Sequence, residues 1–321
     1  MRKRIKIETP SRLHLGFIEL NHNSDRSFGS LGLTIDKYKN VIEIYACDKF
    51  RVISENIDIK KIVENIFKIF LKKYKIKVCG FKIQKFIPQH IGLGSGTQLS
   101  LGIGLLISDF NNLKLSLDQI SLLLKRGLRS GIGIESFKSG GFIVDGGKKR
   151  GTKLIPQIII NHEWPTSWKI ILILDKSSLG VSGGKEIQEF KKIKKVNSDI
   201  AKNNSIALVK NILPGLVEKN FNEFTKGLEI IQRNMSKIFY PKKKKFTSLK
   251  IEKIFTFLKK NNVNGLGQTS WGPTGFVFCE NLKKRNQLFY EIENYIKRNN
   301  ISDITLERIN GKNNGFRKIG L

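Results

Sequence analysis

The chain has 321 residues, 40% of them hydrophobic and 26% charged, which is typical of a globular protein with two domains or one large one. Its formal net charge is +31, but outside two dense runs at 191–195 and 242–245 the lysines are scattered, and no nucleic-acid recognition motif accompanies them. The three cysteines lack metal or redox spacing, and no apolar run is long enough for a signal-peptide core or a membrane span. We therefore expect a cytoplasmic protein without a nucleic-acid or membrane partner.

The first half of the chain alternates short strands with helices. Polar turns separate the strands expected at residues 4–8, 12–19, 31–36, 41–46, 77–86, 140–145 and 168–175. Apolar residues at helical spacing predict helices at residues 59–74, 97–110 and 117–125.

The second half is richer in helices. They are expected at residues 184–193, 198–218, 221–236, 247–260 and 282–298, with strands at 275–280 and 302–309. Pro214 and Gly215 should kink the second of these helices or end it early. We expect a mobile or only partly ordered tail at residues 310–321, and a division into domains 1–181 and 182–321. Mixed strands and segregated helices indicate an α+β architecture.

A glycine-rich run at residues 88–106 is the strongest single signal in the chain. It reads PQHIGLGSGTQLSLGIGLL and leads from a loop directly into an apolar stretch with helical character. Glycines allow close backbone approach, and a helix start presents unpaired N–H groups with the positive end of the helix dipole. A phosphate is therefore expected here, and the candidate contacts are Gly92, Gly94, Ser95, Gly96, Thr97 and Gln98.

The spacing within this run differs from two common nucleotide-binding motifs. A Walker loop needs Lys and then Ser or Thr after its last glycine, whereas Gly96 is followed by Thr97 and Gln98. A dinucleotide fingerprint needs a third glycine at position 97. The hydroxyls of Ser95 and Thr97 either cap the helix or reach a phosphate-bound Mg²⁺, and a tight turn without a ligand is the alternative for the whole loop.

Two runs nearer the N-terminus place basic side chains beside glycine. Arg12 and His14, in the run 10–16, are two residues apart and so share one face of a strand. They either contact a substrate or form a satisfied polar strand edge. Arg26, in the run 25–32, also lies beside flexible backbone.

Two later runs combine glycines with polar or aromatic side chains. The run 126–147 holds seven glycines, and Glu135 or Asp145 within it could hold Mg²⁺ or act as a base, although each acid could also be a solvated or capping group. In the run 265–275, Trp271 either plugs a domain interface or stacks on a ring. The other candidates in these two runs are Arg129, Ser130, Gln268, Ser270 and Thr274.

Taken together and in chain order, the five runs resemble those of one family. The loop PQHIGLGSGTQ resembles the phosphate-binding motif of the GHMP superfamily, which is named for galacto-, homoserine, mevalonate and phosphomevalonate kinases. The segments PSRLHLGFIEL, DRSFGSLGLTI, GLGSGTQLSLGIG, RSGIGIESFKSGGFIVDGG and GQTSWGPTGF resemble the β-ribofuranosylaminobenzene 5′-phosphate synthase family within it. The last two segments are the ones that separate this family from the kinases.

The resemblance implies a fold, a reaction and a set of partners. The fold would be α+β and GHMP-like, with an N-terminal α/β domain containing a left-handed-crossover-type sheet module and a C-terminal ferredoxin-like domain. The enzyme would be a glycosyltransferase that joins 5-phosphoribosyl 1-pyrophosphate to 4-hydroxybenzoate or 4-aminobenzoate, releasing CO₂ and pyrophosphate. It would need Mg²⁺, form a homodimer, and act in tetrahydromethanopterin biosynthesis, within one-carbon metabolism.

This implied reaction gives the candidate residues roles, with several choices left open. One of Arg12, Arg26 and Arg129 would orient the carboxylate and another the 5-phosphate. Either His14, Glu135 or Asp145 would take the proton of the ring's 4-hydroxyl. Mg²⁺ would be held by oxygens of Ser95, Thr97 or Glu135. The alternatives are an ATP-dependent kinase of the same superfamily and a basic nucleic-acid-binding protein.

Overall fold

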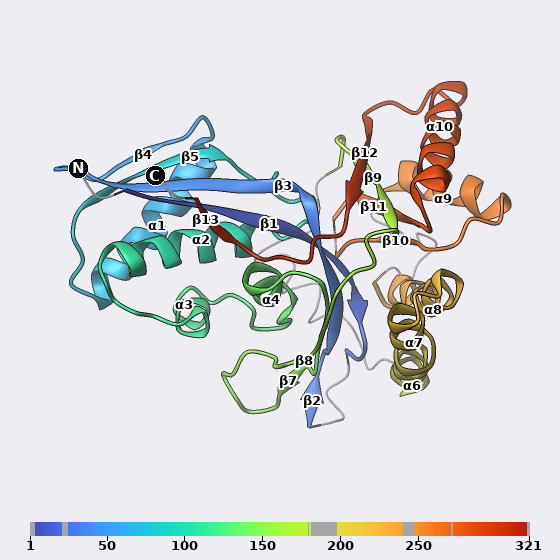
Figure 1. Ribbon diagram of the computed structural model, residues 1–321, viewed down its shortest axis with the longest axis horizontal. Coiled ribbons are helices and arrows are strands. Elements are labelled where there is room, and N and C mark those ends of the chain that lie inside the picture. Colours follow the sequence, from blue (N-terminus) through green and yellow to red (C-terminus); the bar gives the residue numbers. More distant parts are fainter. Residues whose placement is uncertain are drawn as a thin grey trace.

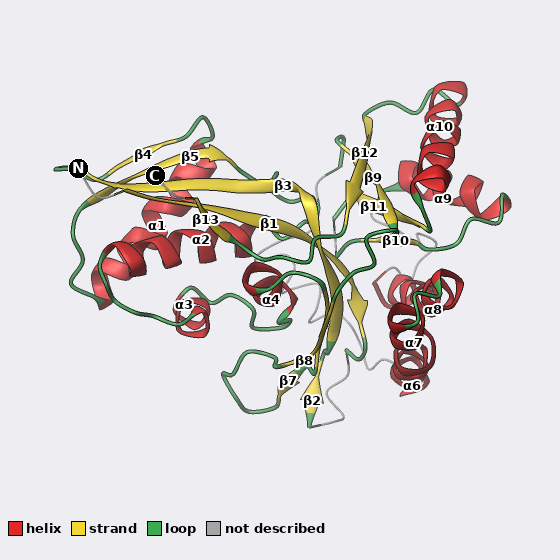
Figure 2. Cartoon of the chain, in the orientation of Figure 1, coloured by secondary structure: helices red, strands yellow, loops and turns green. Residues whose placement is uncertain are grey.

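The computed structural model describes residues 4–20, 25–178, 180, 198–239, 248–270 and 272–319, and two sheets organise them (Figures 1 and 2). The first sheet has seven strands and the second has four, and β2 (Arg26–Ser27) forms a small separate ribbon with β7 (Lys148–Lys149). Within the described part of the chain, no helix combines the length and apolarity needed to cross a bilayer.

The first sheet is built around two long antiparallel strands. The C-terminal half of β3 pairs with β5, its N-terminal half pairs with β6, and β4 runs parallel to β5. On the other side, β1 pairs with both β3 and β13. The strands are β1 (Arg4–Phe17), β3 (Ser30–Ala46), β4 (Arg51–Ile53), β5 (Cys79–Lys85), β6 (Phe142–Asp145), β8 (Ile158–His162) and β13 (Arg317–Ile319).

Helices cover one face of this sheet (Figure 1). They are α1 (Ile57–Lys73), α2 (Ser95–Phe110), α3 (Leu117–Leu123) and α4 (Ile132–Lys138). The side chain of Asn56 caps α1 by accepting from the Ile59 N–H, and the helix buries the apolar stripe that its sequence spacing predicts. Helix α2 is buried on nearly all sides from Gln98 onward, whereas its first three residues are half-buried.

The second sheet has the strand order β10-β11-β9-β12, with every neighbouring pair antiparallel. Its strands are β9 (Lys169–Asp175), β10 (Leu266–Gln268), β11 (Thr274–Cys279) and β12 (Ile304–Asn310). Helices α6 (Ser198–Ala207), α7 (Leu213–Val217), α8 (Phe221–Phe239) and α9 (Leu249–Lys260) connect β9 to β10, and α10 (Leu282–Arg298) connects β11 to β12. This split β-α-β arrangement is ferredoxin-like, which confirms the expected C-terminal fold.

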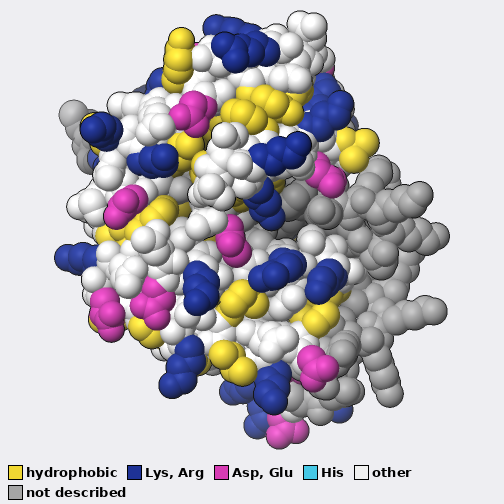
Figure 3. Space-filling model, turned by 90° about the vertical axis from the view of Figure 1, so that its right-hand side faces the viewer, with side chains coloured by type: hydrophobic (Ala, Val, Ile, Leu, Met, Phe, Trp, Pro, Cys, Tyr) yellow, Lys and Arg dark blue, Asp and Glu magenta, His cyan; other side chains and the backbone are white. Residues whose placement is uncertain are grey.

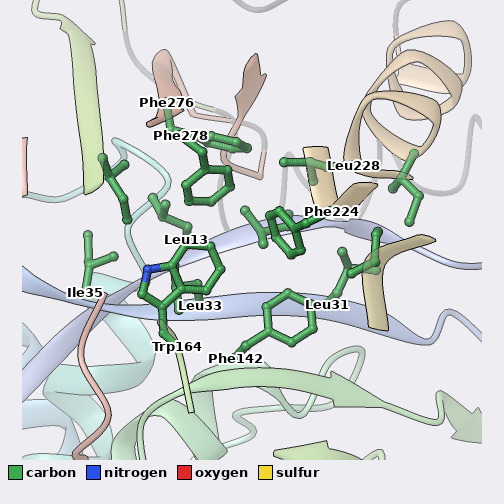
Figure 4. Close-up of a cluster of buried hydrophobic side chains, with 14 of the residues drawn as sticks. Leu13, Leu31, Leu33, Ile35, Phe142, Trp164, Phe224, Leu228, Phe276 and Phe278 are labelled. Atoms are coloured by element: carbon green, nitrogen blue, oxygen red, sulfur yellow. The ribbon is translucent and has the colours of Figure 1, made fainter. Parts of the chain in front are cut away.

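An aromatic core joins the two sheets (Figure 4). Trp164 packs edge-on against Phe224, with ring centroids 5.4 Å apart, and also contacts Phe278 of the second sheet at 5.1 Å. Leu13 of β1 and Phe142 of β6 belong to the same cluster. Because this core is shared, β1 and the β10–β11 turn are fixed relative to each other.

The charge is dispersed on the face formed by the C-terminal helices. Figure 3 shows lysine and arginine side chains spread over this face, with acidic and apolar side chains between them. The described basic residues do not form one continuous stripe on this face. The two dense lysine runs, at 191–195 and 242–245, lie outside the described residues.

Two expected strand breaks are wrong. Residues 4–8 and 12–19 were expected as separate strands, as were 31–36 and 41–46, but each pair forms one long strand. The polar residues that suggested turns are satisfied within the sheet: the Asn40 side-chain amide donates to Thr9 Oγ1 at 2.9 Å, and its carbonyl accepts from the Ile87 N–H at 2.9 Å. A register shift between Thr9 and Ser11 takes up the bend at Pro10.

The expectation of a mobile tail is also wrong for the residues described. β13 pairs with β1, and the preceding Phe316 ring stacks on Phe137 with centroids 4.7 Å apart. Gly311 lies so close to Trp164 that a Cβ would approach Cδ1 to 2.3 Å. These contacts give the tail a fixed path that its polar composition does not suggest.

The helix expected at residues 198–218 is interrupted, as Pro214 suggested. A π-helical segment, η1 (Leu208–Ile212), lies between α6 and α7, and Pro214 falls in the first turn of α7. The helix expected at 184–193 lies outside the described residues. The division into domains at residue 182 stays a prediction. Strand β9 precedes that residue but pairs in the second sheet, and β13, near the C-terminus, pairs in the first sheet.

Candidate active site

A cavity of about 350 Å³ opens at the N-terminal end of α2. The glycine loop, the start of α2, β1, the segment after α3 and the β10–β11 turn all contribute to its walls. Seven of the predicted site residues line it: Arg12, Gly92, Gly94, Ser95, Gly96, Thr97 and Ser270. No acidic side chain of the described residues lines this cavity, so its walls favour an anion.

The backbone of the glycine loop turns the start of α2 toward the cavity. Gly92 and Gly94 have φ values of +83° and +82°, in the left-handed region that favours glycine. The Gly94 carbonyl accepts the N–H groups of Thr97 and Gln98, each at 3.1 Å, and so begins the helix. The first N–H groups of the helix precede these bonds and are available to a phosphate oxygen.

Arg12 joins β1 to the glycine loop. Its Nη1 donates to the Gly92 carbonyl at 2.6 Å, and its backbone N–H donates to the Leu93 carbonyl at 3.2 Å. The guanidinium lies against Gly94, where a Cβ would come within 3.2 Å of the Arg12 Cζ. Glycine at position 94 therefore leaves room for a fixed positive charge beside the helix start.

Thr269, in the turn between β10 and β11, ties three motifs together. Its hydroxyl accepts the His14 N–H at 2.9 Å and donates to the Gly92 carbonyl at 3.0 Å, and the residue is fully buried. The neighbouring Ser270 N–H donates to the His14 carbonyl at 3.2 Å. The C-terminal sheet thus holds the strand that carries Arg12 and His14 against the glycine loop.

His14 is a buried imidazole between two arginines. Burial, together with the nearby charges of Arg12 and Arg129, lowers the pKa of His14 to about 3. Its Nε2 has no hydrogen-bond partner among the described residues, and its ring packs on Phe17 with centroids 4.6 Å apart. At neutral pH this is an uncharged ring with a nitrogen that can bond to a ligand.

This environment predicts a pH dependence of stability. The unfolded chain binds a proton at His14 near pH 6.5 and the folded protein does so only near pH 3, so unfolding takes up a proton in between. The contribution of His14 to the free energy of unfolding should therefore decline as pH falls from 6.5, by up to about 1.4 kcal/mol per pH unit. Urea denaturation of wild type and His14→Gln between pH 7 and 5 tests this. The free energy of unfolding should fall less steeply with falling pH in the variant, because the variant has no imidazole at position 14. Equal slopes would show that His14 is not held neutral.

Asp145 stabilises the fold of the 126–147 run through hydrogen bonds. Its carboxylate is fully buried and accepts from the Gly131 and Gly147 N–H groups, both at 2.9 Å, and from the hydroxyls of Ser30 and Ser130. Burial raises the pKa of Asp145, while these four donors act in the opposite direction. With its acceptor positions filled, Asp145 orders the turn that follows Arg129 and leads into α4.

None of the remaining predicted residues that the structure describes lines this cavity. Glu135 accepts from the Asn161 amide at 3.0 Å, and exposed Arg26 donates to the Gly147 carbonyl at 3.2 Å. Gln98 is buried and donates to the Gly133 carbonyl at 2.7 Å. The residues predicted in the last run include Gln268, which donates to the Ser270 carbonyl, buried Thr274, and Trp271, which lies outside the described residues.

Metal ligands are sparse around this cavity. In the parts of the chain that the structure describes, no three His, Cys, Asp or Glu side chains gather as a metal site. The hydroxyl-bearing Ser95 and Thr97 lie in the cavity wall, whereas Glu135 does not. The donor set fits a magnesium ion that shares its ligands with substrate phosphates better than one held by protein groups alone.

Sequence reasoning missed Thr269 and Arg126. Arg126 lines the cavity together with Arg12, and a Cβ at Gly96 would lie 3.4 Å from its Nη1. Both residues lie in glycine-rich runs that the sequence indicates as parts of the site, but the candidates predicted in those runs are Arg129 and the neighbours of Thr269. The only available signal was position beside glycine, which several other residues share.

The fold and the glycine-loop cavity define the chain as a protein of GHMP-kinase type. A family model described as "GHMP kinases N terminal domain" matches residues 59–142. Mevalonate diphosphate decarboxylase of Staphylococcus aureus shares the fold with a TM-score of 0.71 at 12% identity, over 100% of this chain and 99% of that one. Homoserine kinase of Cytophaga hutchinsonii does so with a TM-score of 0.66 at 12% identity, over 99% and 98%. Such low identities establish the fold alone.

Curated relatives identify the particular family. β-Ribofuranosylphenol 5′-phosphate synthase of Methanocaldococcus jannaschii is 32% identical over 318 residues, covering 88% of this chain and 93% of the relative. The synthase of the same name from Methanothermobacter thermautotrophicus is 29% identical over 287 residues, covering 83% and 86%. The chain belongs to this family of enzymes, which are pentosyltransferases, and the family expected from the motifs is confirmed.

Proposed function

We propose that the chain condenses 5-phosphoribosyl 1-pyrophosphate with 4-hydroxybenzoate, with release of CO₂ and pyrophosphate. The observation that carries this proposal is the position of Arg12. Its guanidinium flanks the anion cavity, and its charge also reaches the buried His14. Arg12 would thus link the proposed diphosphate site to the buried imidazole that we assign to the acceptor. The name of the relatives, which specifies a phenol, favours 4-hydroxybenzoate over 4-aminobenzoate.

The bond changes balance without an oxidant or reductant. The bond between ribose C1 and the pyrophosphate oxygen breaks, and the electron pair leaves with pyrophosphate. A carbon–carbon bond forms between C1 and the ring carbon that carries the carboxylate. The electrons of the carbon–carboxylate bond then restore the aromatic ring as CO₂ leaves, and the proton withdrawn from the 4-hydroxyl returns to it.

The described residues supply binding and proton-transfer groups for these changes. The first N–H groups of α2 and Arg12 would stabilise charge on the departing diphosphate. A magnesium ion among Ser95, Thr97 and the phosphates would add Lewis-acid stabilisation of the same oxygens. Arg129 would orient the acceptor carboxylate, since its charge acts on the ring of His14.

We assign His14 as the group that takes the 4-hydroxyl proton. Of the three candidates, Asp145 already accepts four hydrogen bonds and Glu135 bonds to Asn161, whereas the Nε2 of His14 is unused among the described residues. Bound carboxylate and diphosphate would offset the charges of Arg12 and Arg129, which would raise the pKa of His14 toward a useful range.

A carbon-release assay tests the proposed reaction. The protein is incubated with 5-phosphoribosyl 1-pyrophosphate, MgCl₂ and 4-hydroxybenzoate labelled in its carboxyl carbon, and we expect labelled CO₂ and one pyrophosphate per turnover. Omitting the phosphoribosyl substrate is the control. ATP hydrolysis dependent on an alcohol or acid acceptor, without CO₂ release, would instead support the alternative of a GHMP-type kinase. The homodimer, the cytoplasmic location and a role in tetrahydromethanopterin biosynthesis stay predictions from the family resemblance.

A further inference from the structure

Arg126 lines the same cavity as Arg12. Its Nε donates to the hydroxyl of buried Ser100 at 3.1 Å, which fixes the side chain against α2. Its Nη1 lies across the first turn of that helix, close to Gly96, while Arg12 lies against Gly94. Two guanidinium groups therefore flank one helix start, each anchored to a different neighbour.

Within the described parts of the chain, no acidic side chain balances the charge of Arg126. Among the described residues, its side chain has one hydrogen bond, to neutral Ser100, and no carboxylate pairs with it. Burial lowers the pKa of Arg126, but a guanidinium stays protonated at neutral pH. A desolvated cation without a counter-ion is costly unless a ligand supplies the negative charge.

We propose that Arg126 and Arg12 form a two-armed clamp for a diphosphate, with one phosphoryl group at each guanidinium and the helix start between them. A single phosphate at the helix start would need only one of these arms. The two guanidinium groups lie beside Gly94 and Gly96, both in the lining of one cavity, and the fork of each can bind two oxygens, so together they can hold a ligand with two linked anionic groups. The ligand class is inorganic pyrophosphate or the diphosphate end of an activated sugar. This inference rests on the proposed function, since pyrophosphate is its leaving group.

Calorimetric titration of the whole protein with inorganic pyrophosphate, at fixed MgCl₂ and ionic strength, tests the clamp. We expect Arg126→Met to raise the Kd for pyrophosphate at least about tenfold, the loss typical of a charge-assisted contact, and to change the Kd for inorganic phosphate much less. Arg126→Lys, which keeps the charge and loses the fork, should fall between. Arg298→Met, which removes the same charge from the exposed end of α10, is the matched control.

The possible results test the diphosphate clamp and the proposed reaction independently of each other. Wild-type affinity for pyrophosphate in Arg126→Met, or an equal loss for phosphate and pyrophosphate, overturns the clamp even if CO₂ release is observed. Arg126-dependent pyrophosphate binding without CO₂ release supports the clamp and contradicts the proposed reaction. Should Arg126→Met fail to fold, Ser100→Ala releases the guanidinium from its anchor while keeping its charge, and unchanged pyrophosphate affinity in both Ser100→Ala and Arg126→Lys would count against the clamp.

Discussion

Replacing Arg12 with alanine should lower kcat/KM for the phosphoribosyl substrate by roughly tenfold to a hundredfold. Arg12 Nη1 holds the Gly92 carbonyl at 2.6 Å, and the guanidinium faces the cavity at the start of α2. A charge-assisted hydrogen bond is worth about 1.5–3 kcal/mol, which corresponds to that range of rate. The loss should appear in both kcat and KM, because the same charge binds the diphosphate and stabilises it as it leaves. Labelled CO₂ release under steady-state conditions measures it.

Two further variants separate the effect of the planar guanidinium fork of Arg12 from the effect of its positive charge. Arg12→Lys keeps a positive charge but cannot bond to the Gly92 carbonyl and a phosphate through one planar fork, so partial activity is expected. Arg298→Ala removes an equal charge from the surface and should leave turnover unchanged. Near wild-type turnover in Arg12→Ala would remove Arg12 from the proposed site and, with it, the main support for the reaction.

Replacing Gly92 with alanine should destabilise the protein by about 2–5 kcal/mol and abolish most activity. Its φ of +83° costs an L-residue about 1–2 kcal/mol, and the new Cβ would lie 2.5 Å from the Thr269 carbonyl oxygen and 3.2 Å from the Gly272 Cα. Both are backbone atoms and cannot rotate away. Urea denaturation measures the change in the free energy of unfolding, and CO₂ release measures the activity.

Gly151 provides a matched control for this substitution. Its φ is +72°, but a Cβ there would meet nothing within 4 Å. Gly151→Ala should therefore show the backbone cost alone, about 1–2 kcal/mol, with activity retained. The difference between the two variants reports how tightly the β10–β11 turn closes on the glycine loop. Equal losses at both positions would mean that this contact contributes nothing to stability.

Local patterns predicted most of the elements. The helix expected at residues 282–298 has those bounds in the structure, because its apolar side chains recur at helical spacing and the side chain of Asn281 caps it. The long strands were less predictable: the polar stretch around Asn40 resembles a turn until its partners, Thr9 and Ile87, are known. Those partners are distant in sequence, and local propensity does not report them.

The sequence by itself determined the backbone conformation of the glycine loop. Gly92 and Gly94 must be glycine for the backbone to turn at positive φ, and an apolar helix directly follows them, so the geometry on which the proposed phosphate site rests is encoded within a few adjacent residues. The resemblance of five separate runs also identified the family, which the relatives confirmed.

Only the tertiary structure decided which polar residues surround that loop. Arg126 and Arg129 look alike in sequence, but the chain reversal after α3 places Arg126 in the cavity wall, whereas Arg129 acts on His14. Asp145 looked like a catalytic acid until its four donors were seen, and Thr269 gained a role only when the second sheet packed on β1. The physical reason is that hydrogen bonding and desolvation depend on neighbours brought together by packing, and no spacing along the chain contains them.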